Sequence, residues 1–442
     1  MAESKLILLI LAGNSALNGS FSLSRALIEQ GHRVFYITSN LGNREYVESQ
    51  GFNYLVVPTD DYEYPFPAAW NTKNTLIRRT RATRNIFDKL DYIYGQAEKW
   101  IAEANPDIVL LDPILTQFSI PFVKKNIPVV NINTTLSSTA QAGRPPVFSG
   151  FVPPKTSNPL AALRMKMAWQ FIYAYHSIKA LNRSFYLTLA FGSPGKMIRT
   201  QLKKHGAKTK KGEYGIQLIV PEIFMNSRHF DFPASQSSSP QLKLYMGACV
   251  EEKRVQESFD FKFLDKEKKL IYCAMGTMSK VYKFQKNLYQ CLFEAMDQLA
   301  GYQLILQSEG VGDLGQYKRI PENVLVVARA PQLKLLELTS VFITHGGAGS
   351  TREGAYYGVP MIVFPGWHDQ PGNAARVVYH GLGEKADMKT ITTKKLLSLI
   401  DKVINDPDIR DNVRKMREKL RKDDNRHSII QFIESYSSYW HA

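Results

Sequence analysis

The chain has 442 residues, of which 44% are hydrophobic and 22% charged, a balance that is typical of globular proteins and excludes a largely disordered chain. Its length predicts two or three domains. The formal net charge of +16 indicates attraction to anions, which include phosphorylated small molecules, anionic membrane surfaces and nucleic acids. Since no zinc-finger spacing or other known nucleic-acid-binding motif is present, we expect no nucleic-acid partner.

The N-terminal residues predict a buried strand and not a targeting segment. The apolar run Leu6–Ala12 follows a short segment that contains Glu3 and little positive charge, unlike a secretory signal peptide. No run reaches the roughly 18 apolar residues that a membrane-spanning helix needs. The three cysteines show neither disulfide nor metal-site spacing, and an odd number is typical of a reducing compartment. We therefore expect a soluble, cytoplasmic protein.

The first third of the chain alternates between strand and helix patterns, which predicts βαβ units and a parallel sheet. Short apolar runs indicate the strands, and apolar residues at helical spacing indicate the helices between them. We expect strands at Leu6–Ala12, Arg33–Thr38, Tyr54–Val57, Ile108–Leu111 and Pro128–Ile132, and helices at Ser20–Gln30 and Arg44–Gln50.

The stretch from Ala140 to Val220 breaks this alternation and is rich in Pro, Gly, Lys and aromatic residues. Within it, Leu160–Leu181 has the pattern of an amphipathic helix, with Trp169 among its apolar residues. Such a helix could make peripheral contact with a membrane surface. The alternative is a helix that packs on the first domain.

Alternation resumes after a charged segment, which we interpret as a linker between two domains. We expect an N-terminal domain at 1–250, the linker at 251–262, a C-terminal domain at 263–425 and a final helical segment at 426–442. The predicted fold class is α/β, with two Rossmann-like, doubly wound parallel sheets in tandem. Because such sheets bind ligands at the carboxyl ends of their strands, two facing domains would form a binding cleft.

A glycine-rich turn at His345–Gly354 follows the apolar strand Val341–Thr344 and opens a helix. Glycines let the backbone approach a ligand closely, and a helix start presents unpaired N–H groups with about half a positive charge. Together these features favour a diphosphate. The turn lacks both the Walker lysine and the G-x-G-x-x-G spacing, so it differs from those two phosphate-binding motifs.

Several spaced elements around this turn resemble the signature of the family 1 UDP-glycosyltransferases, especially the bacterial macrolide-type branch. The resemblance implies the GT-B architecture, in which two Rossmann-like domains face each other across a cleft. The N-terminal domain would bind the acceptor, the C-terminal domain would bind the nucleotide sugar, and the final helix would return to the N-terminal domain. The matching residues are Ala330–Gln332, Thr344–Glu353, Gly358–Pro360 and Asp369–Ala374, with a weaker match at Gly31–Val34.

The resemblance also implies a UDP-sugar as donor and a role for particular residues. No metal or other cofactor is expected, because the donor segment shows no paired carboxylates with divalent-ligand spacing. The implied donor-binding positions are Gln332 for the uracil, Glu353 for the ribose, Asp369 and Gln370 beside Trp367 and His368 for the sugar, and Gly276, Thr277, His345, Gly347, Gly349, Ser350 and Thr351 for the diphosphate.

The catalytic base that the family typically carries is missing from this chain. Family members place a histidine just after the first strand, where it deprotonates the acceptor hydroxyl and is oriented by an aspartate. Here the histidine position falls on Ala16, and alanine cannot take a proton. The orienting residue would be Asp112, at the end of the strand Ile108–Leu111, although an acid at a strand end can also simply cap a helix.

Three interpretations of Ala16 are open. The chain could be a form inactivated by replacement of a histidine, a natural enzyme that uses Asp112, water or a pre-ionised acceptor, or a non-catalytic sugar-nucleotide-binding or partner protein. The resemblance implies an inverting transfer of a hexose, with glucose as the first candidate, to a hydroxyl of a small lipophilic or phenolic acceptor. Aromatic segments around Phe66, Trp70 and Trp169 would hold that acceptor.

Overall fold

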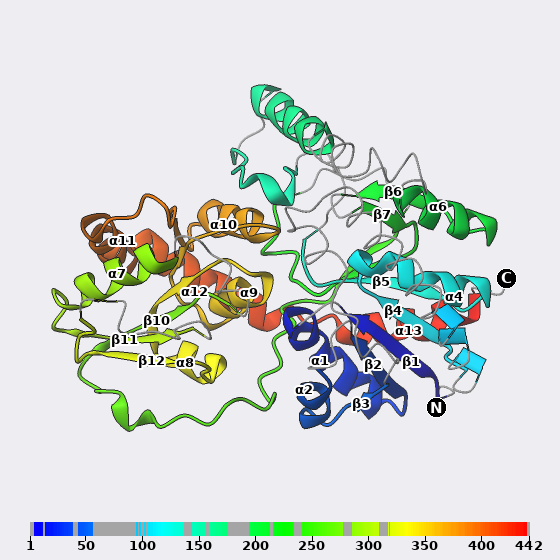
Figure 1. Ribbon diagram of the computed structural model, residues 1–442, viewed down its shortest axis with the longest axis horizontal. Coiled ribbons are helices and arrows are strands. Elements are labelled where there is room, and N and C mark those ends of the chain that lie inside the picture. Colours follow the sequence, from blue (N-terminus) through cyan, green and yellow to red (C-terminus); the bar gives the residue numbers. More distant parts are fainter. Residues whose placement is uncertain are drawn as a thin grey trace, which may run out of the picture.

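The computed structural model describes residues 4–11, 14–38, 43–55, 94–95, 97–98, 101–102, 105–136, 144–155, 159–174, 194–212, 215–233, 241–276, 285–308, 317 and 319–439. Two parallel β-sheets lie side by side, each accompanied by helices (Figure 1). The first sheet is built from strands between residues 6 and 245, here called the first half of the chain, and the second from strands between residues 269 and 385, the second half.

The first sheet contains seven strands in the order β3-β2-β1-β4-β5-β8-β9, and all its pairs are parallel. Its central strands are buried along their whole length, as expected for parallel strands covered on both faces. Leu9 and Leu8 of β1 belong to different clusters of buried side chains, so this sheet has a core on each face. The strands are β1 (Leu6–Leu11), β2 (Arg33–Thr38), β3 (Asn53–Tyr54), β4 (Ile108–Leu111), β5 (Val129–Asn133), β8 (Glu222–Phe224) and β9 (Lys243–Tyr245).

The helix after β1 begins earlier than its sequence pattern predicts. We expected Ser20–Gln30, whereas α1 spans Asn14–Glu29. Leu17 and Phe21, one helical turn apart, are both fully buried in the core, and this packing extends the helix toward the strand. The position of the expected base, Ala16, therefore lies in the first turn of a helix. The other elements of this half are α2 (Asn43–Ser49), η1 (Pro113–Ser119), α4 (Ile120–Lys124), η2 (Val147–Ser149), α6 (Pro194–Lys204) and the hairpin β6 (Thr209–Gly212) and β7 (Gly215–Leu218).

The second sheet contains six strands in the order β12-β11-β10-β13-β14-β15, again with parallel pairs throughout. The predicted α/β class with two doubly wound parallel sheets is confirmed. The strands are β10 (Lys269–Ala274), β11 (Tyr302–Gln307), β12 (Val324–Val327), β13 (Thr339–Thr344), β14 (Met361–Val363) and β15 (Gly383–Lys385), and the helices are α7 (Gln285–Met296), α8 (Gln332–Leu338), α9 (Ala348–Tyr357), α10 (Gln370–Tyr379), α11 (Thr393–Asn405) and α12 (Pro407–Lys422).

The last helix, α13 (Arg426–Tyr439), packs on the first sheet. Ile429, Ile430 and Ile433 lie in the same buried cluster as side chains of β1 and α1. Glu434 reaches the ring of His32, with 3.1 Å between its Oε1 and Nε2. Just before α13, Asp424 forms an isolated antiparallel β-bridge with Gly247, which lies two residues after β9. The segment that leaves the first half of the chain therefore lies against the segment that returns to it.

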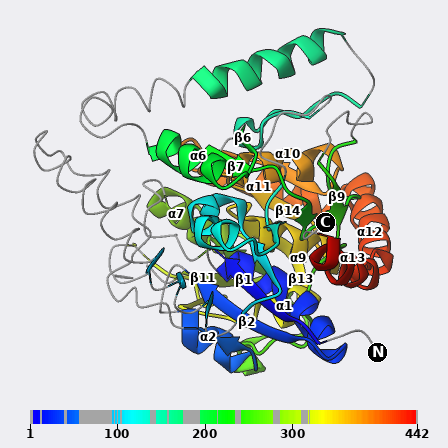
Figure 2. The same ribbon diagram turned by 90° about the vertical axis from the view of Figure 1, so that its right-hand side faces the viewer.

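Residues 159–174 form a helix at the periphery of the molecule, and both views show it standing apart from the two sheets (Figures 1 and 2). Trp169 and Ile172 are buried, and the Trp169 indole N–H donates to the Arg144 carbonyl at 2.8 Å. The opposite stripe is exposed, most of all Phe171 at 71%. None of the helices in the described ranges is long and apolar enough to cross a membrane.

Candidate functional site

The turn between β13 and α9 lies at the carboxyl end of a central strand of the second sheet. Gly346 has a φ of +84°, and a Cβ there would lie 2.7 Å from the Val363 side chain, so this position requires glycine. Gly347 is the N-cap of α9 and supplies no side-chain cap. The backbone N–H groups at this helix start, together with the positive end of the helix dipole, form an arrangement that favours an anion.

The His345 ring is held between two glycines from different turns. A Cβ on Gly276 or on Gly347 would lie 2.6 Å from a ring atom of His345, and Gly276 also has a positive φ of +74°. Burial lowers the pKa of His345 to about 4, so the ring is neutral at pH 7. Three positions that the resemblance implies for the diphosphate thus lie together, whereas Thr277 lies outside the described residues.

A residue of the first half caps the start of α9. The Gly349 amide donates to Ser15 Oγ at 3.2 Å, across 334 residues of sequence. Helix α1 also approaches α9 at Gly19, one helical turn after Ser15. A Cβ on Gly19 would lie 3.1 Å from the Arg352 guanidinium, so the two helices are close together there. Sequence reasoning missed Ser15, although it directly precedes the position of the expected base. The start of α9, where the resemblance implies the diphosphate, therefore lies where the two halves meet.

Ala16 and Asp112 are both buried in this structure. Ala16 is 4% exposed and packs in the core cluster of the first sheet. Asp112 is the N-cap of η1, where its Oδ1 accepts from the Ile114 amide at 3.0 Å. Asp112 thus caps η1, and its role in orienting a base stays a prediction.

Glu353 on α9 lies in a buried cluster with two donors. The Arg254 guanidinium donates to both of its carboxylate oxygens, at 2.6 and 3.2 Å. Gln332 Nε2 donates to Oε2 at 2.6 Å, so the two residues implied for the nucleoside are joined directly. Burial alone would raise the pKa of Glu353, but the charge and hydrogen bonds of Arg254 outweigh it and hold that pKa below its usual value. Sequence reasoning did not single out Arg254.

The start of α10 is tied to the turn before α9 by Asn373. Its Nδ2 donates to Asp369 Oδ2 and to the Gly346 carbonyl, each at 2.8 Å. Burial raises the pKa of Asp369. Gln370 Oε1 accepts from the backbone amides at 366 and 367, which fixes the loop before the helix. The two residues implied for the sugar are therefore anchored next to the start of α9.

The remaining predicted positions differ in exposure. Trp367 is exposed, and His368 is exposed with a positive φ of +53°, a conformation that is rare outside glycine and common at functional sites. The Thr351 hydroxyl donates back to carbonyls within its own helix at 3.0 Å and 3.3 Å, and Thr351 is fully buried. Ser350 is partly exposed. Of these two hydroxyls, that of Ser350 is the better placed for a ligand.

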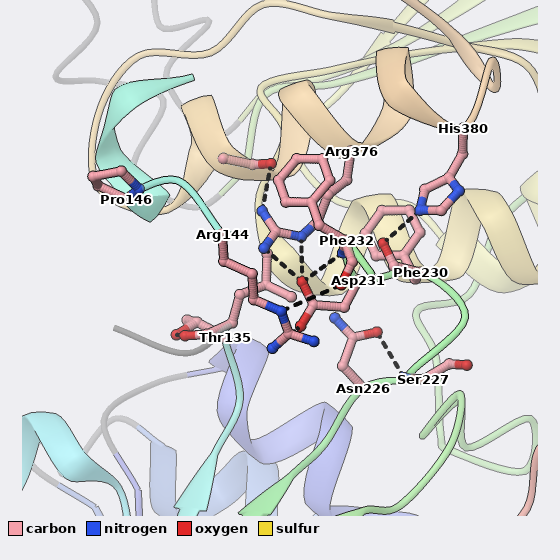
Figure 3. A network of polar contacts seen from close by, with 12 residues as sticks. Thr135, Arg144, Pro146, Asn226, Ser227, Phe230, Asp231, Phe232, Arg376 and His380 are labelled. Carbon is pink, nitrogen blue, oxygen red and sulfur yellow. Dashed lines mark hydrogen bonds and ion pairs between the residues drawn. The ribbon is translucent and has the colours of Figure 1, made fainter. Parts of the chain in front are cut away.

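An ion-pair cluster holds α10 against the first half of the chain (Figure 3). Asp231 lies between two guanidinium groups, with Arg376 Nη2 at 2.6 Å and Arg144 Nη1 at 2.8 Å. All three side chains are buried, and Arg376 also stacks on the Phe232 ring at 4.1 Å. Arg376 belongs to α10, whereas Asp231 and Arg144 precede the linker. This cluster therefore joins the two halves beside the residues implied for the sugar.

Among the residues that the structure describes, no group of three or more His, Cys, Asp or Glu side chains is arranged to hold a metal ion.

Residues 161–427, more than half of the chain, match a family model described as UDP-glucoronosyl and UDP-glucosyl transferase. Among curated proteins, the chain is 27% identical over 212 residues to the uncharacterized UDP-glucosyltransferase YdhE of Bacillus subtilis (strain 168), covering 48% of this chain and 52% of that protein. It is 26% identical over 167 residues to the oleandomycin glycosyltransferase of Streptomyces antibioticus, covering 38% of each. These matches span about half the length of the first curated relatives or less.

Solved structures match over nearly the whole chain. The glycotransferase of kitacinnamycin has a TM-score of 0.70 at 22% identity, covering 99% of this chain and 100% of that one. The glycosyltransferase VinC, solved in complex with dTDP, has a TM-score of 0.66 at 15% identity, covering 98% and 100%. At these identities the structures support the fold.

Proposed function

Because the chain belongs to the UDP-glucoronosyl and UDP-glucosyl transferase family, we propose that it moves a hexose, with glucose as the first candidate, from a UDP-sugar to a hydroxyl of a small lipophilic or phenolic acceptor, with inversion at the sugar. The two facing parallel-sheet domains have the GT-B fold that the sequence resemblance implied. The single observation that carries the proposal is the start of α9, where backbone N–H groups and the neutral His345 ring meet at the junction of the two halves.

In this proposal the start of α9 takes the diphosphate of the donor. Charge develops on the departing diphosphate during transfer, and fixed N–H groups with a helix dipole stabilise it without reorganisation. His345, neutral at pH 7, contributes a hydrogen bond and not a positive charge. Ser15 Oγ, which now accepts from the Gly349 amide, would yield that amide to a phosphate oxygen.

The rest of the donor follows from the neighbouring helices. Gln332 and Glu353 lie together at the position implied for the uracil and the ribose. Asp369, tied by Asn373 to the turn before α9, would accept from hydroxyls of the sugar, with the exposed Trp367 beside it. A UDP-sugar bound in this way would present its anomeric carbon to the first half of the chain, where the acceptor would bind.

A second candidate function, a sugar-nucleotide-binding protein without catalysis, is favoured by one observation. Ala16 occupies the base position, is buried and carries no titratable group, while Asp112 caps η1. The two candidates share the donor site and differ only in turnover. Of the aromatic segments proposed for the acceptor, Trp169 is buried against the first half, and Phe66 and Trp70 lie outside the described residues.

Peripheral membrane contact of residues 159–174 stays a prediction. Leu160, Leu163, Met167 and Phe171 recur at helical spacing on one exposed stripe, next to the exposed Arg164. An apolar stripe flanked by cationic side chains is the pattern of a helix that lies on an anionic surface.

Titration calorimetry with UDP and UDP-glucose tests the donor site that both candidates share. We expect both nucleotides to bind, and UDP to bind more weakly to a His345→Ala variant because one hydrogen bond to the diphosphate is lost. Absence of heat with either nucleotide, in a chain whose circular dichroism shows it folded, would remove the proposal.

We predict that Gly276→Ala weakens UDP binding by about tenfold. The methyl group would lie 2.6 Å from the His345 ring, and the positive φ of +74° disfavours any Cβ, which costs about 1–2 kcal/mol. Gly301→Ala is the matched control, since it lies in the same half with open space around its Cβ. Equal affinity of the two variants, measured by calorimetry, would contradict this account of His345.

A further inference from the structure

The linker reaches into the donor site through one side chain, Arg254. Its guanidinium forms a two-pronged ion pair with Glu353 of α9, and both side chains are almost completely buried, at 7% and 2% exposure. Arg254 belongs to the segment that joins the two halves. Its guanidinium contacts the carboxylate of Glu353, which in the proposed function binds the pentose. The contact therefore bears directly on how the pentose is recognised.

The hydrogen-bonding capacity of the Glu353 carboxylate is nearly used up. An ionised carboxylate offers about four acceptor positions, two on each oxygen. Arg254 Nη1 takes one position on Oε1, while Arg254 Nη2 and Gln332 Nε2 take both positions on Oε2. Since no other described residue donates to this carboxylate, about one position, on Oε1, stays open to a ligand within the part of the chain that the structure describes.

A ribose has two vicinal hydroxyls, and each needs an acceptor position of its own to bind as a donor. A 2′-deoxyribose has one. With a single open position on Oε1, the carboxylate can accept a hydrogen bond from one hydroxyl of either sugar. The second hydroxyl of a ribose then forms no hydrogen bond with this carboxylate. The pentose preference of the site is therefore set by how many positions Arg254 and Gln332 occupy.

We propose that Arg254 is a specificity-determining residue for the donor nucleotide: by occupying acceptor positions of Glu353, it makes the site accept 2′-deoxyribonucleoside diphosphates almost as well as ribonucleoside diphosphates. The proposal rests on the proposed donor site, and it concerns the pentose alone. Arg254 touches the pentose-binding group and not the pentose, so it acts by positioning and by competition.

The charge state of Glu353 is compatible with this role. The ion pair with Arg254 keeps the pKa of the buried carboxyl below its usual value, so Glu353 is an acceptor without a proton at neutral pH. A protonated carboxyl would instead donate to a hydroxyl and change the count of positions.

Calorimetric dissociation constants for UDP and dUDP test the proposal, because these two probes share base and phosphates and differ only at the 2′ position. For the unmodified chain we expect the two constants to agree within about threefold. For Arg254→Met, which frees positions on both oxygens, we expect UDP to be favoured by about tenfold at a pH high enough to keep Glu353 ionised without its ion pair, the usual effect of one hydrogen bond to a charged group. Arg25→Met is the control, since Arg25 pairs with the linker residue Glu251 and does not touch Glu353.

Gln332→Met keeps the test decisive if Arg254→Met does not fold. It frees one position on Oε2 without disturbing the ion pair, and whatever base contact it loses is lost by UDP and dUDP alike. We expect a preference for UDP of about tenfold here also. A preference for UDP of tenfold or more in the unmodified chain, or variants whose ratio equals that of Arg25→Met, would overturn the proposal. If neither nucleotide binds the unmodified chain, the donor site itself is wrong.

Discussion

Replacing Ala16 with histidine is expected to raise the rate of sugar transfer by about 10²- to 10⁴-fold, the usual contribution of a general base. In the proposed donor site this position would lie beside the departing diphosphate, because its neighbour Ser15 contacts the Gly349 amide at 3.2 Å. A histidine in the first turn of α1 would thus stand at the junction where acceptor hydroxyl and donor meet. Since its unperturbed pKa is about 6.5, the gain should appear as pH rises through that value.

The increase in transfer rate that a general base provides has to be distinguished from the effect of a larger side chain at position 16. Ala16 is only 4% exposed and packs in the core of the first sheet, where a larger side chain typically costs about 1–3 kcal/mol of stability. Ala16→Gln is the matched control, because glutamine resembles histidine in size and cannot take a proton. Both variants would be assayed with UDP-glucose and a panel of phenolic and lipophilic alcohols, with products read by mass and melting temperatures recorded.

The outcomes separate the interpretations of Ala16. Activity in the histidine variant alone would mean that the chain lacks only its base. Equal activity in the unmodified chain would contradict the prediction and place the base elsewhere, with Asp112→Asn as the next variant. Binding of UDP with no product from any form would favour the non-catalytic sugar-nucleotide-binding protein.

The parts of the site that could be predicted are those in which local sequence dictates geometry. Gly346 and Gly347 allow a sharp turn from a buried strand into a helix, and the apolar runs around them are typical of parallel strands covered on both faces. His345 was expected at the diphosphate, and the structure brings its ring between Gly276 and Gly347. The turn depends on backbone conformation and periodicity, which a single sequence carries, whereas the expectation for His345 came from the resemblance to the family.

The parts of the site that we did not predict are contacts between residues that lie far apart in the sequence. Arg254 and Glu353 are separated by 99 residues, and Asp231 and Arg376 by 145, so no spacing rule connects them. The start of α1 was misplaced for a related reason. Asn14, Ser15 and Gly19 weaken the helical pattern, and packing of the apolar side chains among them decides where the helix begins.

Substituting Asp231 with asparagine is expected to destabilise the protein by about 3–5 kcal/mol, the usual cost of removing one member of a buried ion pair. Arg376 and Arg144 would be left as two like charges in a buried site, each having lost a partner at 2.6 or 2.8 Å. Burial by itself would raise the pKa of Asp231, but the two arginines lower it below the usual value. The stabilisation is therefore complete above the unfolded-state pKa of about 3.9 and is lost as pH falls through the lower folded-state pKa.

Asp411→Asn is the matched control, since Asp411 pairs with Arg414 and Lys415 at the surface, where solvent screens such pairs and they contribute little to stability. Urea midpoints of the two variants, taken between pH 5 and 8, should differ by the same amount throughout, because Asp231 stays ionised over that range. Similar midpoints would mean that the stacking of Arg376 on Phe232 holds α10 without the carboxylate.

The same substitution should also weaken binding of the donor sugar. Asp231 and Arg144 precede the linker and Arg376 lies in α10, so the cluster fixes α10, and with it Asp369, against the first half of the chain (Figure 3). In the proposed arrangement UDP contacts α8, α9 and the turn before α9, whereas UDP-glucose also reaches Asp369 at the start of α10. Calorimetry on Asp231→Asn should therefore show a larger loss of affinity for UDP-glucose than for UDP. Equal losses would mean that the cluster stabilises the fold without positioning the sugar site.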